Sequence, residues 1–316
     1  MPQLSCSAFV VRQKSEASAH FADRTNLTLP GYQLDLIQAV HGAGVPTVVV
    51  LINSGGLAAE WVYDNIPAVL EAYYPGEMGG DAMASVLLGD VSPAGRLTTT
   101  IYPAGFVMQR NITDMEMRPH GAVPGVTYRF YPHEDALFSF GYGMSYASQH
   151  PLSCGWFALL IVMAVGRYTS FAFEWDSKPF AGQTDFHTTT AAIHASLPTY
   201  FAGQPMPALP TWRVKVTNVG KRPSDVVVMC FVSSARQGAP LRQLAAFERV
   251  HNLLPGRDQN VLLTPSPTAL TTVDAEGRES ILAGTHSVSC GGEPDGWVNG
   301  TLVVQGEPVT IFEMPR

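Results

Sequence analysis

A glutamate and a tryptophan follow a glycine turn in the first half of this chain. The turn is Ser54-Gly55-Gly56, it comes directly after an apolar run, and Glu60 and Trp61 lie a few residues beyond it. In an α/β sheet, ligands bind at the carboxyl ends of the strands, so this position is typical of a site. Trp61 offers a flat ring for stacking on a ligand. A tryptophan more often packs in a core or an interface, so packing is the preferred role for Trp61 and stacking is the alternative.

The elements around this turn predict an α/β domain. Val48 to Ile52 is a nearly continuous apolar run, as expected of a parallel strand that is buried on both faces. Ala68 to Ala72 predicts the next strand, and Pro75-Gly76 separates it from a helix that begins at Gly79-Gly80 and stops at Gly89-Asp90. No GK[ST] follows the first glycine pair, so we expect close helix–strand packing there and no phosphate loop. Two more elements precede these: a strand over Ala8 to Val11 and a helix over Gln33 to His41.

The second half of the chain has a different period. From Thr211, short alternating strands are separated by turn residues, which is typical of a β-sandwich. The expected strands are Trp212 to Val216, Val226 to Val232, Leu244 to Val250, Val261 to Thr264 and His286 to Ser289. The pattern therefore predicts an α/β domain with a mostly parallel sheet, followed by an all-β sandwich.

The composition fits a folded protein and excludes some functions. The 316 residues are enough for two domains, and 46% hydrophobic against 14% charged residues allow a real core. A net charge of −7 gives no basic footprint for nucleic acid. The four cysteines show no CxxC or Cys/His spacing, so we expect neither a metal nor a cofactor, and buried free thiols rather than a disulfide. They are Cys6, Cys154, Cys230 and Cys290.

Signals for export are weak in this sequence. The N-terminus, MPQLSCSAFVVRQK, lacks the long apolar core and basic start of a signal peptide, so export by that route is not expected for the chain as written. Glycosylation sequons begin at Asn26, Asn111 and Asn299, but short sequons arise by chance. They favour secretion only slightly.

Five ordered motifs in the first half resemble the second domain of family 3 glycoside hydrolases. The longest is YPGEMGGDAMASVLLGDVSPAGRL, from Tyr74 to Leu97. TDMEMRPH (113–120) and PGVTYRFY (124–131) have the form typical of the β-xylosidase branch, and FSFGYGMSY (138–146) closes the series. After Thr211, VKVTNVGKRPSDVVVMCFV and LAAFERVHNLLPG resemble the fibronectin type III-like domain that follows in many of these hydrolases.

The resemblance implies a retaining glycosidase, which needs a carboxylate nucleophile and a second carboxyl as general acid/base. In this family the nucleophile is an aspartate on a (β/α)8 barrel before this domain. Since only about twenty residues precede Asp23-Arg24 and a barrel takes roughly 250, we expect the nucleophile to lie outside the chain. The acid/base is expected in the family pattern ExExxDR, where Ser18 and His20 replace both glutamates. Glu16 is the nearest acid and the candidate acid/base; a solvated loop residue is the alternative.

Other site residues follow from the same resemblance. Asp23, Arg24 and Trp61 are candidates for contact with the sugar, although Asp23 and Arg24 equally fit a structural pair or a cap. Arg118 and His120 lie in a loop expected near the barrel, so we expect an interdomain contact there. Met115 and Met117, in the same loop, are expected to pack. His20 is expected to be a surface residue.

The resemblance also sets the domain boundaries. We expect the family 3 C-terminal domain over residues 1–146, an apolar insertion or linker over 147–167, and the fibronectin-like domain over 168–316, opening with a strand over Thr169 to Trp175. Trp156 to Val165 is ten apolar residues, about half of what a bilayer span requires, so no transmembrane anchor is expected. Residues 177–210 would be a long polar insertion of undetermined structure.

Three functions are compatible with these observations. The first is the C-terminal part of a β-xylosidase that hydrolyses β-linked xylo-oligosaccharides and is inactive without its barrel. The others are a non-catalytic carbohydrate-binding or scaffolding fragment, and an incomplete gene model. Segments 54–61 and 118–131 concentrate aromatic residues, so we expect an exposed patch that causes self-association or binds a barrel partner. Its members are Trp61, Tyr63, Tyr128, Phe130 and Tyr131.

Overall fold

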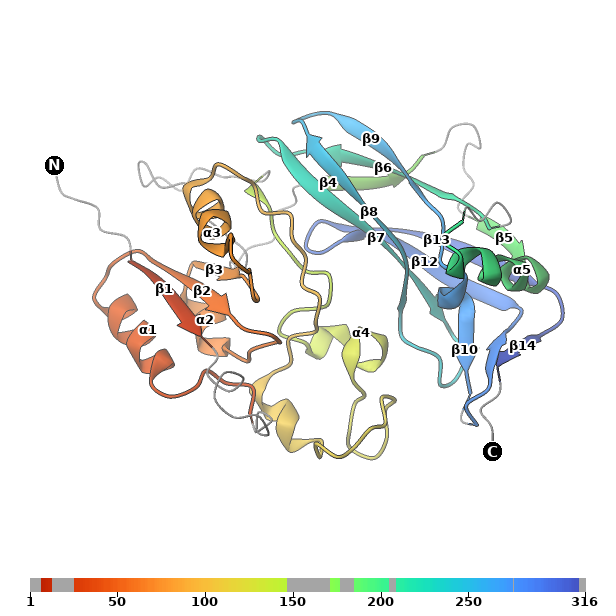
Figure 1. Cartoon of the computed structure of the whole chain (residues 1–316), viewed down its shortest axis with the longest axis horizontal. Helices are drawn as coiled ribbons and strands as arrows, with labels where there is room; N and C mark the ends of the chain where they lie inside the picture. The colour runs from red at the N-terminus through yellow and green to blue at the C-terminus, as the bar shows by residue number, and fades with distance from the viewer. Residues whose placement is uncertain are drawn as a thin grey trace.

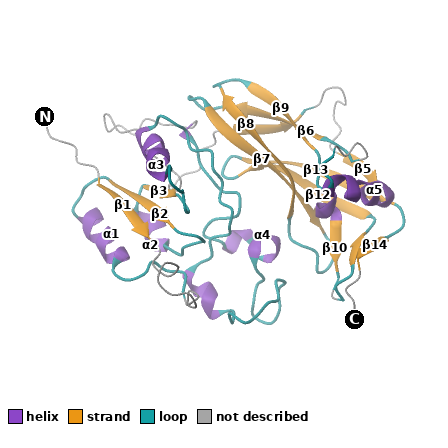
Figure 2. Cartoon of the chain, viewed as in Figure 1, coloured by secondary structure: helices purple, strands orange, loops and turns teal. Residues whose placement is uncertain are grey.

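The computed structural model describes residues 7–12, 26–146, 171–176, 185–204, 209–274 and 276–312, with the backbone alone for residues 7–12. An α/β region and an all-β region lie side by side, and the short helix α4 (Thr127–Phe130) lies between them (Figure 1). Coloured by secondary structure, the helices gather in the first region and the strands in the second (Figure 2). This division confirms the predicted fold class.

The first region is built on a three-stranded parallel sheet in the order β1-β2-β3. The strands are β1 (Ser7–Arg12), β2 (Thr47–Ile52) and β3 (Ala68–Glu71), close to the predicted ranges. Five of the six residues of β2 are buried, as the continuous apolar run predicts for a strand covered on both faces.

Helices cover both faces of this sheet. Helices α1 (Gln33–Gly42) and α2 (Glu60–Asn65) pack on the face that carries Val49 and Leu51. Helix α3 (Gly79–Leu88) packs on the opposite face, and Gly89 ends it in the left-handed conformation that glycine favours. The strands are parallel, so their carboxyl ends lie together at one edge of the sheet, which the helices do not cover.

A long irregular segment connects the sheet to the second region. It contains the 3-10 helix η1 (Ala104–Met108), α4, and the 3-10 helix η2 (His133–Asp135). Ile101 and Phe138 pair as an isolated antiparallel bridge, which holds the two ends of the segment together. The motif FSFGYG then brings Gly141 against Met229 of the sandwich, where a Cβ would lie 2.6 Å from the Met229 methyl carbon. Gly141 also has a φ of +87°, in the left-handed region that favours glycine.

The second region is a sandwich of antiparallel strands with an added parallel edge. One sheet has the order β4-β6-β9 and the other β5-β13-β12-β7-β8, while β10-β11-β14 forms a small third sheet. The strands are β4 (Phe171–Trp175), β5 (Asp185–Thr189), β6 (Trp212–Asn218), β7 (Ser224–Ser234), β8 (Gln243–Leu253), β9 (Asp258–Leu263), β10 (Thr271–Val273), β11 (Glu279–Ile281), β12 (Gly284–Gly292), β13 (Gly296–Gln305) and β14 (Val309–Phe312). Phe171, Trp212, Val288 and Leu302 meet in the fully buried core between the sheets.

Part of the predicted insertion at 177–210 belongs to this core. Strand β5 pairs in parallel with β13, and α5 (Thr190–Phe201) follows it at once. The Thr189 side chain caps that helix by accepting a hydrogen bond from the backbone N–H of Ala192. Ile193 and Leu197, four residues apart on one helix face, are buried in the sandwich core. A helix and an edge strand therefore extend the sandwich where the sequence pattern shows only a polar insertion.

The expectation of free thiols is wrong for two of the cysteines. Cys230 of β7 and Cys290 of β12 are directly paired residues on neighbouring strands and form a disulfide. Spacing in the sequence cannot show this, because the two residues are 60 positions apart and only the strand pairing brings them together. Cys6, Cys154 and the apolar segment from Trp156 to Val165 lie outside the described residues. Within the described ranges, no helix is long and apolar enough to cross a membrane.

Candidate functional site

Most residues of the predicted acid/base loop fall outside the described part of the chain. These are Glu16, Ser18, His20, Asp23 and Arg24. In the sequence they follow Arg12, the last residue of β1, and β1 lies beside β2 in the sheet order. The described side chains of the carboxyl edge of the sheet lie at the ends of β2 and β3.

Glu60 and Trp61 open helix α2 beside this edge. One Glu60 carboxylate oxygen accepts a hydrogen bond from the backbone N–H of Ala104 at 2.7 Å, which ties the helix to the start of η1. The Trp61 ring is half-buried against the core under α1, and its edge meets the His41 ring at a centroid distance of 5.8 Å. Trp61 thus makes the packing contacts expected of it, and its contact with a sugar stays a prediction.

A buried amide and a buried carboxyl meet at the ends of β2 and β3. Asn53, fully buried, donates from its side chain to the Gly55 carbonyl at 2.5 Å. Glu71 is the last residue of β3, and its Oε1 accepts a long hydrogen bond of 3.4 Å from the backbone N–H of Tyr73. Among the described residues, Glu71 Oε2 and Asn53 Oδ1 are buried without a hydrogen-bond partner. This pair is the polar centre of the edge.

Burial changes the acidity of Glu71. Desolvation raises the pKa of this carboxyl to about 8, against the smaller lowering effects of the Tyr73 N–H and the Asn53 side chain. Glu71 is therefore protonated at neutral pH and able to donate a proton, which is the state that a general acid requires. Our sequence reasoning missed this residue. The available signal was a glutamate at the end of the apolar run AVLEA, where a predicted strand reaches the ligand-binding edge.

Arg96, from the motif PAGR, fastens the α/β region to the sandwich. Its guanidinium is almost fully buried and donates to the carbonyls of Gly143 and Glu293, the latter at 2.8 Å. It also forms an ion pair with buried Asp295 at 3.6 Å. Burial lowers the pKa of Arg96, and Asp295 opposes that change. The arginine of this motif thus has a structural role at the junction of the two regions.

The loop of Arg118 also joins the two regions. Arg118 donates to the carbonyls of Gly238 and Val273 in the sandwich, at 3.2 and 2.8 Å, whereas the expected contact of this loop with the barrel stays a prediction. His120 stays on the loop, where its Nε2 is 2.9 Å from Asp114 Oδ2. The expected packing of Met115 is wrong within this chain, because its side chain is 85% exposed.

The expected exposed aromatic patch is not present. Tyr63, Phe130 and Tyr131 are buried, and Trp61 and Tyr128 are half-buried against their own chain. The Tyr63 hydroxyl donates to the Leu57 carbonyl in the core. These aromatic motif residues fill the α/β core and the junction with the sandwich, which explains their concentration without any partner. In the connecting segment, the exposed large apolar side chains all lie between residues 108 and 117: Met108, Ile112, Met115 and Met117.

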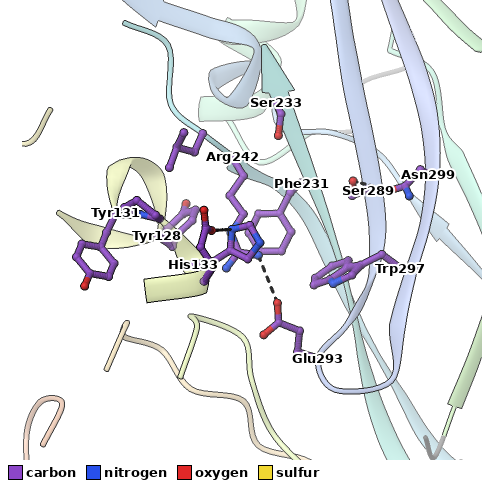
Figure 3. Close-up of a pocket in the computed structure, with 13 residues that line it drawn as sticks. Tyr128, Tyr131, His133, Phe231, Ser233, Arg242, Ser289, Glu293, Trp297 and Asn299 are labelled. Carbon is purple, nitrogen blue, oxygen red and sulfur yellow. Dashed lines mark hydrogen bonds and ion pairs between the residues drawn. The ribbon is translucent and has the colours of Figure 1, made fainter. Parts of the chain in front are cut away.

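A cavity of about 440 Å³ opens at the junction of the two regions. Figure 3 shows Phe231, Arg242 and Trp297 of the sandwich on one side and Tyr128, Tyr131 and His133 from the connecting segment on the other. The Arg242 guanidinium lies 4.8 Å from the Phe231 ring centroid and forms a long ion pair of 3.9 Å with Glu293. Sequence reasoning missed this cavity, because its two walls are about a hundred residues apart in the chain.

Comparison with known proteins agrees with this architecture. Residues 5–146 match the model of the glycosyl hydrolase family 3 C-terminal domain, and residues 226–293 match the fibronectin type III-like domain. A probable exo-1,4-beta-xylosidase xlnD of Neosartorya fischeri is 29% identical over 95% of this chain and 36% of its own length. A protein of the same description from Aspergillus fumigatus is 30% identical over 94% of this chain and 34% of its own length. The chain thus spans about a third of the curated relatives it matches.

Solved structures give the same result. A GH3 exo-beta-xylosidase (XlnD), determined in complex with a xylobiose aziridine activity-based probe, superposes with a TM-score of 0.74 at 26% identity, covering 93% of this chain and 35% of that one. A β-glucosidase from Kluyveromyces marxianus shares the fold, with a TM-score of 0.69 at 23% identity over 96% of this chain and 32% of that one. Residues 5–146 thus carry the glycosyl hydrolase family 3 C-terminal domain, and a fibronectin type III-like domain follows it.

Proposed function

We propose that this chain is the C-terminal part of a retaining β-xylosidase and works with a catalytic barrel that carries the nucleophile. The substrate is a β-linked xylo-oligosaccharide, whose O-glycosyl bonds are hydrolysed in xylan catabolism. The observation that carries the proposal is the similarity to exo-1,4-beta-xylosidases over 93–95% of the chain, across both domains and their junction. Because the chain covers only about a third of those relatives, the nucleophile is assigned to the remaining part.

The carboxyl edge of the sheet supports this proposal. Glu16 follows the last residue of β1 by four positions in the sequence, and Glu71 carries a carboxyl of raised pKa at the end of β3. Double displacement requires one carboxylate as nucleophile and one carboxylic acid as proton donor. In this proposal the edge supplies the acid, with Glu16 as the candidate and Glu71 as the alternative, and the barrel supplies the nucleophile. Glu16 remains our candidate for the acid/base, and Asp23, Arg24 and Trp61 remain candidates for sugar contact.

The barrel contact is assigned to the exposed apolar segment 108–117. Met108 and Met115 are more than four-fifths exposed, and Ile112 between them is 69% exposed. Apolar side chains at this density usually mark an interaction site. In the absence of the barrel, this segment also accounts for self-association of the isolated chain. The family's secretion suggests an extracellular location for the assembled enzyme.

Activity measurements with an aryl β-xyloside test the proposal. The purified chain alone should give the rate of buffer, because one carboxyl cannot carry out double displacement. Mixing it with the separately expressed barrel of a related exo-xylosidase should restore turnover, with barrel alone and a barrel lacking its aspartate as controls. Turnover by the chain alone that disappears in Glu16→Ala would contradict the requirement for a barrel. A stable complex without any glycosidase activity would contradict the proposed function.

A further inference from the structure

The junction cavity has one open aromatic wall. Trp297 of β13 is half-buried, and its ring meets the Phe231 ring edge-on at a centroid distance of 5.6 Å. Phe231 itself is almost fully buried, because the Arg242 guanidinium lies over its ring and the Tyr128 ring packs against it at a centroid distance of 5.9 Å. Trp297 is therefore the aromatic surface at which a ligand is able to dock (Figure 3).

Hydrogen-bonding groups surround this ring on the sandwich side. The Ser289 hydroxyl donates to Asn299 Oδ1 at 2.7 Å, which orients the Asn299 amide so that its nitrogen remains available as a donor. The backbone carbonyl of Glu293 is held by Arg96 and by the Gly143 N–H, so the Glu293 carboxylate projects from a fixed backbone. Arg242 pairs with this carboxylate at a long 3.9 Å, and its Nε is buried without a partner among the described residues. The cavity thus offers several donors and acceptors at fixed positions.

The charge of the lining excludes an anionic ligand. Arg242 is paired with Glu293, and His133 at the rim lies 3.3 Å from Glu134. With one arginine against two carboxylates, the lining carries no excess positive charge for a phosphate or a carboxylate. A volume of about 440 Å³ is within the range of small-molecule sites. The ligand that fits is neutral, has an apolar face for Trp297 and carries hydroxyls around its edge.

We propose that the cavity between Trp297, Asn299, Glu293 and Arg242 binds one neutral pyranose unit of an oligosaccharide. The axial C–H groups of a β-linked sugar ring pack on the indole, and its hydroxyls replace water at Asn299, Glu293 and Arg242. This site is separate from the carboxyl edge of the sheet and holds a sugar without cleaving it. The choice of a xylose oligomer as ligand rests on the proposed function. The inference that the cavity binds a neutral sugar rests on its shape and polarity alone.

Titration of the intact chain with xylotetraose, followed by calorimetry and tryptophan fluorescence, tests the site. We expect saturable binding that weakens at least about tenfold in Trp297→Ala, equivalent to about 1.4 kcal/mol. Trp297→Phe should retain part of the affinity because it keeps an aromatic face. Asn299→Ala should weaken binding without changing the fold. This variant tests the proposed site if Trp297→Ala does not fold. Phe247→Ala, a change at an exposed aromatic side chain of the sandwich that does not line the cavity, should leave this affinity unchanged.

Two results would overturn the proposal. One is the absence of saturable binding by xylotetraose, cellotetraose and maltotetraose up to their solubility limits. The other is binding that is lost in Trp61→Ala but retained in both Trp297→Ala and Asn299→Ala, which would place the sugar at the carboxyl edge. Neither result depends on hydrolysis, so the barrel mixing experiment can succeed while this site fails, or the reverse. Binding of cellotetraose but not xylotetraose would support the cavity and contradict the xylosidase assignment.

Discussion

Replacing Glu71 by glutamine should make the protein more stable at high pH and leave it unchanged at low pH. Glutamine has the shape of the protonated carboxyl and is never ionised. Burial raises the pKa of Glu71 from its ordinary value of 4.5 to about 8 in the folded protein. Between these two values the folded chain keeps a proton that the unfolded chain has released, so the wild type loses stability as the pH rises.

The magnitude follows from the two pKa values. The difference between 4.5 and about 8, at about 1.4 kcal/mol per pH unit, corresponds to about 5 kcal/mol. Because Glu71 as a whole residue is partly exposed and its carboxyl keeps the Tyr73 N–H as a donor, we expect about 2 to 4 kcal/mol of this difference in the folded protein. The contribution is fully present below about pH 4.5 and is lost as the pH rises through about 8.

Urea unfolding from acid to mildly alkaline pH measures this effect. The free energies of unfolding of the wild type and Glu71→Gln should coincide below about pH 4, and the variant should exceed the wild type by about 2 kcal/mol or more near pH 9. Glu77→Gln, a change at an exposed side chain in the next turn, should show the pH dependence of the wild type. A constant difference between Glu71→Gln and wild type at all pH values would refute the argument, because it would mean that the carboxyl is already ionised when folded.

Three further changes test the junction, the disulfide and the barrel contact. Arg96→Met removes the arginine of the buried ion pair, leaves Asp295 with the Phe171 N–H as a donor, and should lower the free energy of unfolding by about 3 to 5 kcal/mol in chemical denaturation. A loss below about 1 kcal/mol would show that water replaces the arginine. Replacing Cys230 and Cys290 together by alanine opens a loop of 60 residues and should cost about 4 kcal/mol, visible as a lower thermal midpoint that no longer responds to reductant. Met115→Glu should leave stability unchanged, since the side chain is 85% exposed, but should prevent association with the barrel in light scattering. Undiminished complex formation by this variant would exclude that segment as the contact.

The order of the helices and strands could be predicted from the sequence, because buried positions recur as apolar residues with the period of each element. Val48 to Ile52 is apolar at every position since helices cover both faces of the strand, and the alternation in Trp212, Val214 and Val216 reflects a strand with one face in the sandwich core. The motif PAGR was recognisable too, but its role was not. Arg96 reaches the Glu293 carbonyl, almost two hundred residues away, and only the assembled junction supplies that partner.

The sequence pattern did not reveal the following features, each of which depends on two distant segments of the chain. The edge strand and helix over Asp185 to Phe201 read as a polar insertion, because only Ile193 and Leu197 on one helix face are needed to join the core. The disulfide depends on the register of β7 with β12, and Phe130 and Tyr131 of the connecting segment are buried by contacts within their own chain. Glu71 is acidic by residue type, yet its protonation at neutral pH is decided by tertiary burial. Local sequence determines which segments become strands and helices, whereas desolvation and pairing arise only when those segments meet.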